Sequence, residues 1–161
     1  MKFKTEDKVT ECIKTFEDAC EALGKEHPFV KSYEKYVNIV GRGETNIIAF
    51  LELRIICTAL NEGWEPIFSK DESRYCPLFD VYTQSEYKGL NKNKKKYCLP
   101  LRSSNNIIAD EDSVFAYAVT VGYTGLYSLT DSSMRLVLKT RELAEYCGKQ
   151  FLYIWADYLL K

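Results

Sequence analysis

The side chains that most often carry out acid–base or nucleophilic chemistry are scarce in this sequence. Histidine is the usual general acid or base near neutral pH, and the single histidine, His27, precedes Pro28 in an expected loop, away from any acidic or cysteine cluster. No G-x-S-x-G motif is present that would expose a nucleophilic serine. We therefore predict a surface or helix-leading role for His27, no catalytic residues, and a protein that is not an enzyme.

The six cysteines do not have the spacing of a metal site or a redox motif. They lie at positions 12, 20, 57, 76, 98 and 147, and no pair has C-x-x-C spacing. Cys76 and Cys98 lie on neighbouring candidate strands, where two thiols can approach each other, but a zinc site needs three or four ligands. We expect reduced thiols that pack as small core residues, with no metal and no cofactor.

A run of lysines is the first feature that indicates binding. It consists of Lys92, Lys94, Lys95 and Lys96 at the tip of an expected hairpin, and it is bordered by Tyr82, Tyr87 and Tyr97. Ammonium groups can follow a phosphate backbone while tyrosine rings stack on bases, as in proteins that bind single-stranded nucleic acid. Charge on a solvated loop can instead keep a sheet edge from pairing with other chains. The solvated loop is the favoured interpretation because the chain as a whole carries a net charge of −1.

An aromatic loop is the second such feature. Its large rings are Trp64, Phe68, Tyr75 and Phe79, and prolines at positions 66 and 77 stiffen it. These rings can form a pocket or a surface for a partner protein. They can equally close one end of the core, which the usual burial of aromatic side chains favours.

Three arginines are candidate anchors for an anion. The guanidinium group suits phosphate, so Arg42, Arg54 or Arg135 could serve a pocket that sequesters or hydrolyses a small phosphorylated ligand such as a nucleotide. The segment Gly41-Arg42-Gly43 lacks the spacing of a Walker or dinucleotide motif, and a turn between helices explains it.

The elements that must position these residues begin with helices. Thr15 is expected to cap a helix that Gly24 ends, Pro28 opens a second helix, and Thr45 or Asn46 caps a third one. This third helix is apolar on nearly all sides and is predicted to be central to the core. The expected helices are Phe16–Leu23, Pro28–Val40, Ile47–Glu62 and a long C-terminal helix that follows Thr140, whereas Val9–Lys14 could either extend the first of these helices or form a short strand.

Strand patterns follow the third helix. The expected strands are Tyr75–Tyr82, Tyr97–Leu101, Ser113–Tyr123 and Met134–Leu138. Helices followed by strands and then one long helix predict an α+β fold: N-terminal helices, a small antiparallel sheet and a long C-terminal helix packed on it. A length of 161 residues without a long linker predicts one globular domain over residues 1–161.

Composition excludes several classes of protein. Lys and Arg number 22 against 23 Asp and Glu, which argues against a chain that is basic throughout and coats nucleic acid. No apolar run approaches the length of a membrane span, and the polar N-terminus does not resemble a secretory signal. We therefore expect a cytoplasmic protein.

Three stretches carry a resemblance to a known group of proteins. They are Thr15–Gly24, Ala59–Pro66 and above all Lys139–Phe151. Together they resemble small uncharacterised proteins of phages, prophages and mobile elements of Bacteroidales bacteria, over most of residues 15–160. Relatives tend to read Tyr-Pro-Trp-Phe in the aromatic loop, from which Tyr75-Cys76-Pro77-Leu78-Phe79 departs. The resemblance implies a cytoplasmic or virion setting and supplies no catalytic residue.

The sequence thus favours a non-enzymatic interaction protein whose partner, expected to be a protein, would contact the aromatic loop. A nucleic-acid-binding accessory protein that uses the lysine run is the alternative. A binder of a small phosphorylated ligand is the third possibility. The oligomeric state is left open.

Overall fold

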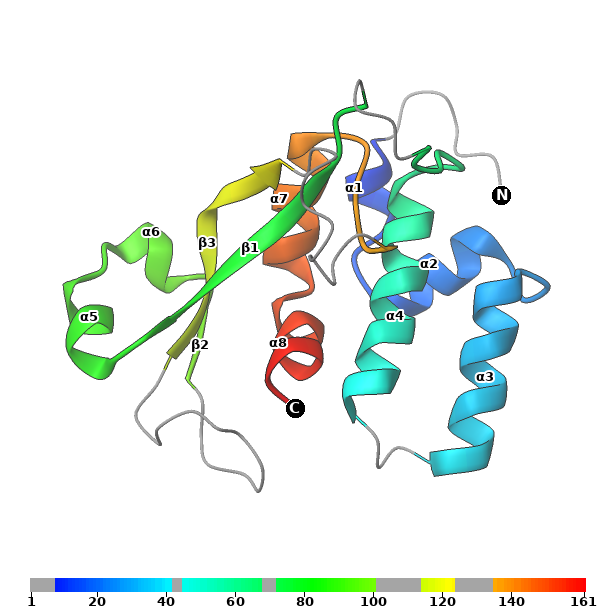
Figure 1. Cartoon of the computed structure of the whole chain (residues 1–161), viewed down its shortest axis with the longest axis horizontal. Coiled ribbons are helices and arrows are strands. Elements are labelled where there is room, and N and C mark those ends of the chain that lie inside the picture. The colour runs from blue at the N-terminus through cyan, green and yellow to red at the C-terminus, as the bar shows by residue number, and fades with distance from the viewer. Residues whose placement is uncertain (1–7, 42–44, 68–71, 101–113, 124–134) are drawn as a thin grey trace.

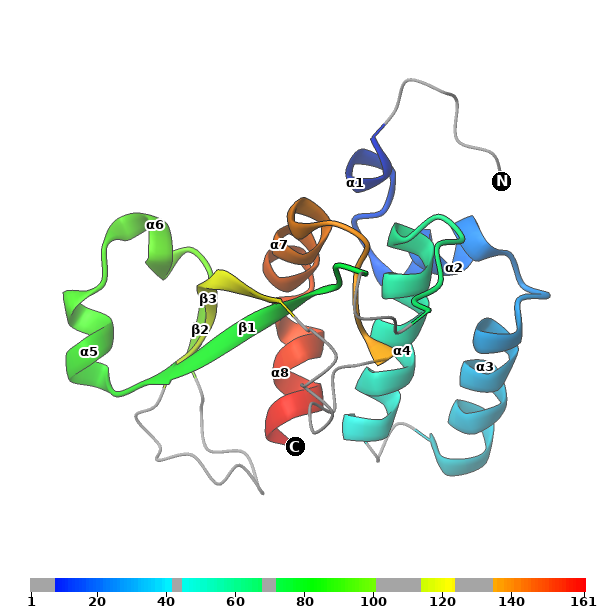
Figure 2. The same cartoon turned by 45° about the horizontal axis from the view of Figure 1, so that its top comes forward.

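The computed structural model describes residues 8–41, 45–67, 72–100, 114–123 and 135–161 (Figure 1). The helices are α1 Val9–Cys12, α2 Phe16–Leu23, α3 Pro28–Val40, α4 Thr45–Leu60, α5 Gln84–Gly89, α6 Lys92–Lys95, α7 Arg141–Gln150 and α8 Leu152–Leu160, and the strands are β1 Tyr75–Tyr82, β2 Cys98–Pro100 and β3 Val114–Tyr123. The α+β prediction is confirmed. Helices α7 and α8 pack on the sheet on one side and on α4 on the other, while α5 and α6 project beyond the sheet (Figure 2).

Local capping signals place the first helices where the sequence predicts them. The Thr15 hydroxyl accepts a hydrogen bond from the Asp18 amide at 3.1 Å, and Gly24 ends α2 with a φ of +86°, a conformation that favours glycine. Backbone amides of Lys14 and Thr15 donate to the Asp18 carboxylate and lower its pKa. His27 leads α3, where its Nδ1 accepts from the Phe29 amide at 3.2 Å. The helix-leading role predicted for His27 is therefore confirmed.

Helix α4 is central to the core, as its apolar sequence predicts. It contacts α2, α3 and α8, and its side chains are buried on several sides, including Leu53, Ile55, Ile56 and Leu60. It begins at Thr45 and ends at Leu60, two residues before the predicted bounds at each end. The undecided segment Val9–Lys14 contributes the short helix α1.

The sheet has the strand order β1-β3-β2, and both outer strands pair antiparallel with β3. The expected hairpin is wrong, because β1 and β2 do not pair with each other and α5 and α6 connect them. Cys76 and Cys98 lie on strands that are not neighbours, so the approach that neighbouring strands would have allowed does not occur, and Cys76 packs in the core as expected. Cys76 pairs with Gly122 and Cys98 with Ala116, so β3 separates the two cysteines.

The last two predicted elements differ in length from those observed. Of the strand expected at Met134–Leu138, a single antiparallel bridge between Leu138 and Tyr75 forms, and Met134 lies outside the described residues. The prediction of a single long C-terminal helix is wrong. The helix is interrupted at Phe151, whose φ of −109° and ψ of 31° end α7 and begin α8. The break turns Leu152 and Ala156 toward Leu99 and Phe115 of the sheet.

None of the helices in the described parts of the chain is long and apolar enough to cross a membrane.

Candidate functional site: a pocket between two arginines

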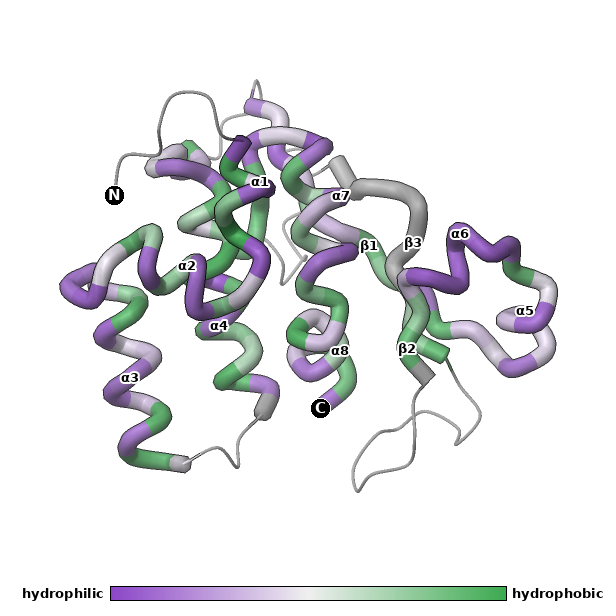
Figure 3. The backbone as a smooth tube through the Cα atoms, turned by 180° about the vertical axis from the view of Figure 1, so that it is seen from behind, coloured by the Kyte–Doolittle hydropathy of each residue, from purple (hydrophilic) through white to green (hydrophobic). Residues whose placement is uncertain are grey.

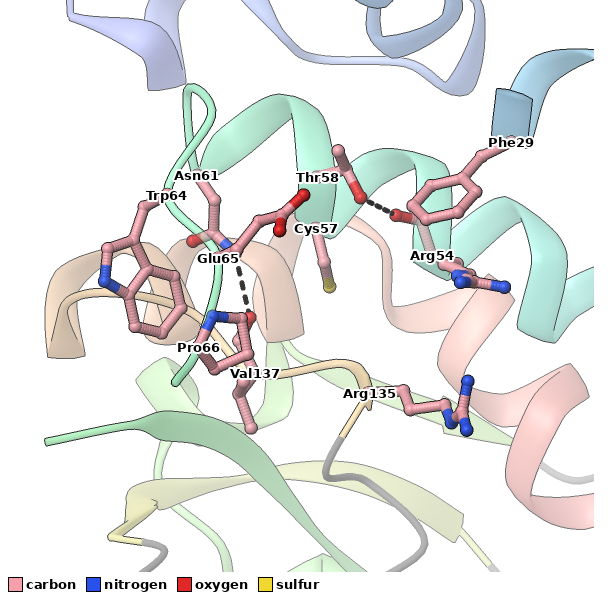
Figure 4. Close-up of a pocket in the computed structure, with 10 residues that line it drawn as sticks. All are labelled: Phe29, Arg54, Cys57, Thr58, Asn61, Trp64, Glu65, Pro66, Arg135 and Val137. Atoms are coloured by element: carbon pink, nitrogen blue, oxygen red, sulfur yellow. Dashed lines mark hydrogen bonds between the residues drawn. The ribbon is translucent and has the colours of Figure 1, made fainter. Parts of the chain in front are cut away.

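A pocket of about 660 Å³ opens where α4, the loop after it and the segment before α7 meet (Figure 4). We call it the Arg54–Arg135 pocket. Its volume lies within the range of about 300–1,000 Å³ that is typical of small-molecule sites. The lining residues are Phe29, Arg54, Cys57, Thr58, Asn61, Trp64, Glu65, Pro66, Arg135 and Val137.

One face of α4, together with Asn61 just after it, forms the first wall. Arg54, Cys57, Thr58 and Asn61 follow each other at i, i+3, i+4 and i+7, a spacing that brings side chains to one side of a helix. The Arg54 guanidinium lies over the ring of Phe29, with Cζ 3.7 Å from the ring centroid, a favourable cation–π arrangement. This contact holds the charged group at one end of the pocket.

The loop after α4 forms the second wall. Glu62 and Gly63 both have positive φ, +51° and +85°, and this turn brings the Trp64 amide within 3.0 Å of the Asn61 carbonyl, to which it donates. At the far end of the loop, the Ile67 amide donates to the Glu72 carboxylate at 3.0 and 3.2 Å. Both ends of the loop are thus held, and Trp64, Glu65 and Pro66 line the pocket.

The segment before α7 carries Arg135 and forms the third wall. Its next three residues, Leu136, Val137 and Leu138, are buried. The side-chain amide of Asn61 donates to the Val137 carbonyl at 2.9 Å, and its oxygen accepts from the Lys139 amide at 3.0 Å. These bonds hold the segment against α4. Arg135, whose side chain is exposed, lies at the start of this bonded segment.

The two guanidinium groups face the same pocket, and no described residue neutralises either of them. No ion pair involves Arg54 or Arg135 among the described residues. Partial burial, and secondarily the charge of Arg135, lower the pKa of Arg54, which remains protonated because arginine starts from so high a value. Among the described residues that line the pocket, Glu65 is the one carboxylate.

The nucleophilic atoms that line the pocket are engaged elsewhere. The Cys57 thiol donates toward the Leu136 carbonyl at 3.7 Å. A hydrogen bond with Cys147 and, to a smaller extent, burial raise the pKa of this thiol well above its ordinary value. The Thr58 hydroxyl donates to the Arg54 carbonyl at 2.7 Å. The prediction of free thiols in the core holds for Cys57, Cys76 and Cys147, whereas Cys12, Cys20 and Cys98 are half-buried.

The structure unites residues that the sequence assigned to two separate hypotheses. Arg54 and Arg135 come from the phosphate hypothesis and Trp64 from the aromatic loop, whereas Arg42 and Phe68 lie outside the described residues. Sequence reasoning missed Phe29, Asn61 and Glu65. The spacing of Arg54, Thr58 and Asn61 at i, i+4 and i+7 was the available signal for one wall.

The remaining aromatic candidates lie apart from the pocket lining. Phe79 stacks on Phe115 with ring centroids 5.0 Å apart, and its ring lies 5.3 Å from that of Trp155. Tyr75 is half-buried against the main core, and its backbone bonds that of Leu138. The three described rings, those of Trp64, Tyr75 and Phe79, are each half-buried and therefore do not form one fully exposed surface.

The lysine run lies on α6 and on Lys96, which follows it, where the tube is hydrophilic (Figure 3). The Lys95 ammonium lies 5.3 Å from the Tyr87 ring centroid and donates to the Lys88 carbonyl at 2.9 Å. Lys149 of α7 reaches within 5.5 Å of the Tyr97 ring centroid. The structure thus adds Lys88 and Lys149 to the lysines and tyrosines that the sequence singled out.

Comparison with protein-family models, with curated proteins and with solved structures finds no match to this chain. Within the described ranges, no group of three or more His, Cys, Asp or Glu side chains is placed to hold a metal ion. The candidate binding residues are therefore those of the pocket and those of α5 and α6, which we call the lysine-rich helices.

Proposed function

We propose that this chain is a non-enzymatic binding protein that takes a small phosphorylated ligand into the Arg54–Arg135 pocket. The observation that carries the proposal is the pair of guanidinium groups at one pocket without an ion-pair partner among the described residues. Like charges that share a site repel each other, and a phosphate relieves that repulsion while it accepts paired hydrogen bonds from arginine.

The proposal of binding without catalysis follows from the other lining groups. The Cys57 thiol has a raised pKa and is buried, so it is a poor nucleophile. The Thr58 hydroxyl already donates to a backbone carbonyl. The expectation of a protein partner at the aromatic loop stays a prediction, and Phe79, one of its rings, is half-buried and packs against Phe115 and Trp155.

A thermal-shift screen with pyrophosphate, ribose 5-phosphate and nucleoside monophosphates tests the proposal. A ligand at about 100 times its dissociation constant stabilises the folded state by roughly 2.7 kcal/mol, which raises Tm by about 5–10 °C for a chain of this size. Arg54→Gln and Arg135→Gln should each weaken binding by roughly tenfold or more, because a hydrogen bond to a charged group contributes about 1.5–3 kcal/mol.

Arg141→Gln is the matched control. Arg141 is an exposed arginine that pairs with Glu145 on its own helix at 3.3 Å, outside the pocket lining, and its loss should leave binding unchanged. The proposal is contradicted if no phosphorylated compound shifts Tm, or if the Arg141 variant loses as much affinity as the two pocket variants.

We propose a second binding surface, for single-stranded nucleic acid, on the lysine-rich helices. It is favoured by the contacts of Lys95 with Tyr87 and of Lys149 with Tyr97, which place cations beside aromatic rings at one end of the molecule. Lys92 and Lys96 are exposed. Cations that neutralise phosphates and rings that stack on bases are the two components of such surfaces.

Reversing the charge of Lys94 and Lys96 should weaken binding of a fluorescent oligonucleotide and flatten its salt dependence. Each lost phosphate contact should reduce the slope of log K against log salt by about 0.7, so the double variant should lose about 1.4. Lys25→Glu with Lys35→Glu, two exposed lysines elsewhere, should cause a smaller change. Absence of binding by the unmodified chain at low salt would remove this second proposal.

A further inference from the structure

The Arg54–Arg135 pocket has two chemically different ends. In the close-up, the two guanidinium groups lie at one end and the indole of Trp64 at the other, with Glu65 between them in this view (Figure 4). A ligand that is charged throughout would use the first end alone. The arrangement instead matches a molecule with a phosphate at one end and a planar ring at the other.

We infer that the ligand is a nucleoside phosphate whose phosphate binds Arg54 and Arg135 while its base stacks on Trp64. The inference rests on the proposed function and adds to it the ligand class. Aromatic side chains stack on any base, because every base has a π-face, so the inference names no particular base.

The position of the indole supports stacking because the loop that carries it is held at both ends. The Trp64 amide bonds the Asn61 carbonyl, and the Ile67 amide bonds Glu72. Pro66 further limits the freedom of the chain between these points. Trp64 is half-buried, so part of its ring is available in the pocket without a rearrangement of the backbone.

Glu65 gives the pocket a second kind of recognition. Its carboxylate repels a phosphate but accepts hydrogen bonds, and ribose hydroxyls and the amino groups of bases are donors. Asn61 already bonds the backbone of Val137 and Lys139 through both ends of its amide, so Glu65, with two charged oxygens, is the stronger acceptor of the two. A ligand with a dianionic end and a donor-rich end satisfies Arg54, Arg135 and Glu65 together.

The test compares adenosine, guanosine, cytidine and uridine 5′-monophosphates with ribose 5-phosphate by calorimetric titration of the full chain. At least one nucleotide should bind about fivefold or more tightly than ribose 5-phosphate, the lower end of what stacking on one aromatic ring supplies. Trp64→Ala should bring that nucleotide to the affinity of ribose 5-phosphate, whereas Trp64→Phe should keep most of the difference.

The outcomes separate this inference from the proposed function. Equal affinity of ribose 5-phosphate and all four nucleotides, with no effect of Trp64→Ala, overturns the inference and leaves the phosphate site intact. Absence of binding by every phosphorylated probe overturns both. If Trp64→Ala fails to fold, two other measurements decide: the affinities of the Trp64→Phe variant and the quenching of Trp64 fluorescence by nucleotide. Quenching reports on Trp64 because the other tryptophan, Trp155, is buried away from the pocket lining.

Discussion

Replacing Trp155 with alanine should lower the free energy of unfolding by about 3–5 kcal/mol, the usual cost of removing a large aromatic side chain from a core. Trp155 is 2% exposed and packs against Phe79 and Tyr158, with ring centroids 5.3 and 6.1 Å away. It joins α8 to the sheet, so the cavity would lie between two layers. The free energy of unfolding of a small protein is about 5–15 kcal/mol, so this loss is a large part of the total. Denaturant titration should therefore show a much lower midpoint.

Two variants of the same helix distinguish the loss of packing from other effects. Tyr153→Ala removes an aromatic ring that is 74% exposed, and it should change stability by no more than about 0.5 kcal/mol. Trp155→Phe should cost far less than alanine, because the buried indole N–H has no hydrogen-bond partner among the described residues and phenylalanine removes that donor. Equal losses for Tyr153→Ala and Trp155→Ala would contradict the assignment of Trp155 to the core.

The helices could be predicted from the sequence because their signals are local. Thr15 and Thr140 each accept a bond from the amide three residues on, as a capping threonine does. The near-continuous apolar sequence of α4 requires burial on several sides. These effects depend on neighbours within one helical turn, so the folded context did not alter them.

The sheet order and the connection from β1 to β2 could not be predicted in the same way. The pairing of β1 with β3, rather than with β2, joins segments far apart in the chain. Helices α5 and α6 contain six and four residues, too few for hydrophobic periodicity to reveal them. The lysine-rich sequence of these two helices therefore resembles that of a turn. The break at Phe151 was missed because the apolar spacing of α7 continues into α8 without a proline.

The candidate site was partly foreseen for chemical reasons and missed for geometric ones. The affinity of guanidinium for phosphate selected Arg54 and Arg135, but nothing in the sequence placed them at one pocket. Their approach depends on Asn61, which joins α4 to the segment that carries Arg135. The spacing of Asn61 from Arg54 and Thr58 indicates a shared helix face, but the sequence does not show that Asn61 bonds the backbone of a segment more than 70 residues away.

Replacing Asn61 with alanine should lower the free energy of unfolding by roughly 2–4 kcal/mol. Asn61 is 5% exposed, and its amide bonds the Val137 carbonyl at 2.9 Å and the Lys139 amide at 3.0 Å. Alanine would leave both backbone groups buried without these partners, and each such loss costs about 1–3 kcal/mol. Denaturant titration should show the loss, and the Asp variant should share much of it because a carboxylate cannot donate to Val137.

A neighbouring contact between the same two segments provides the control. Glu62 and Lys139 form an ion pair at 2.7 Å that is partly open to solvent, so Glu62→Gln should cost no more than about 1 kcal/mol. The two variants also separate stability from the site. If Asn61 positions Arg135, folded Asn61→Ala protein should bind a phosphorylated ligand less tightly than Glu62→Gln protein does. Equal stability and equal affinity of the two variants would show that Asn61 does not hold the segment that carries Arg135.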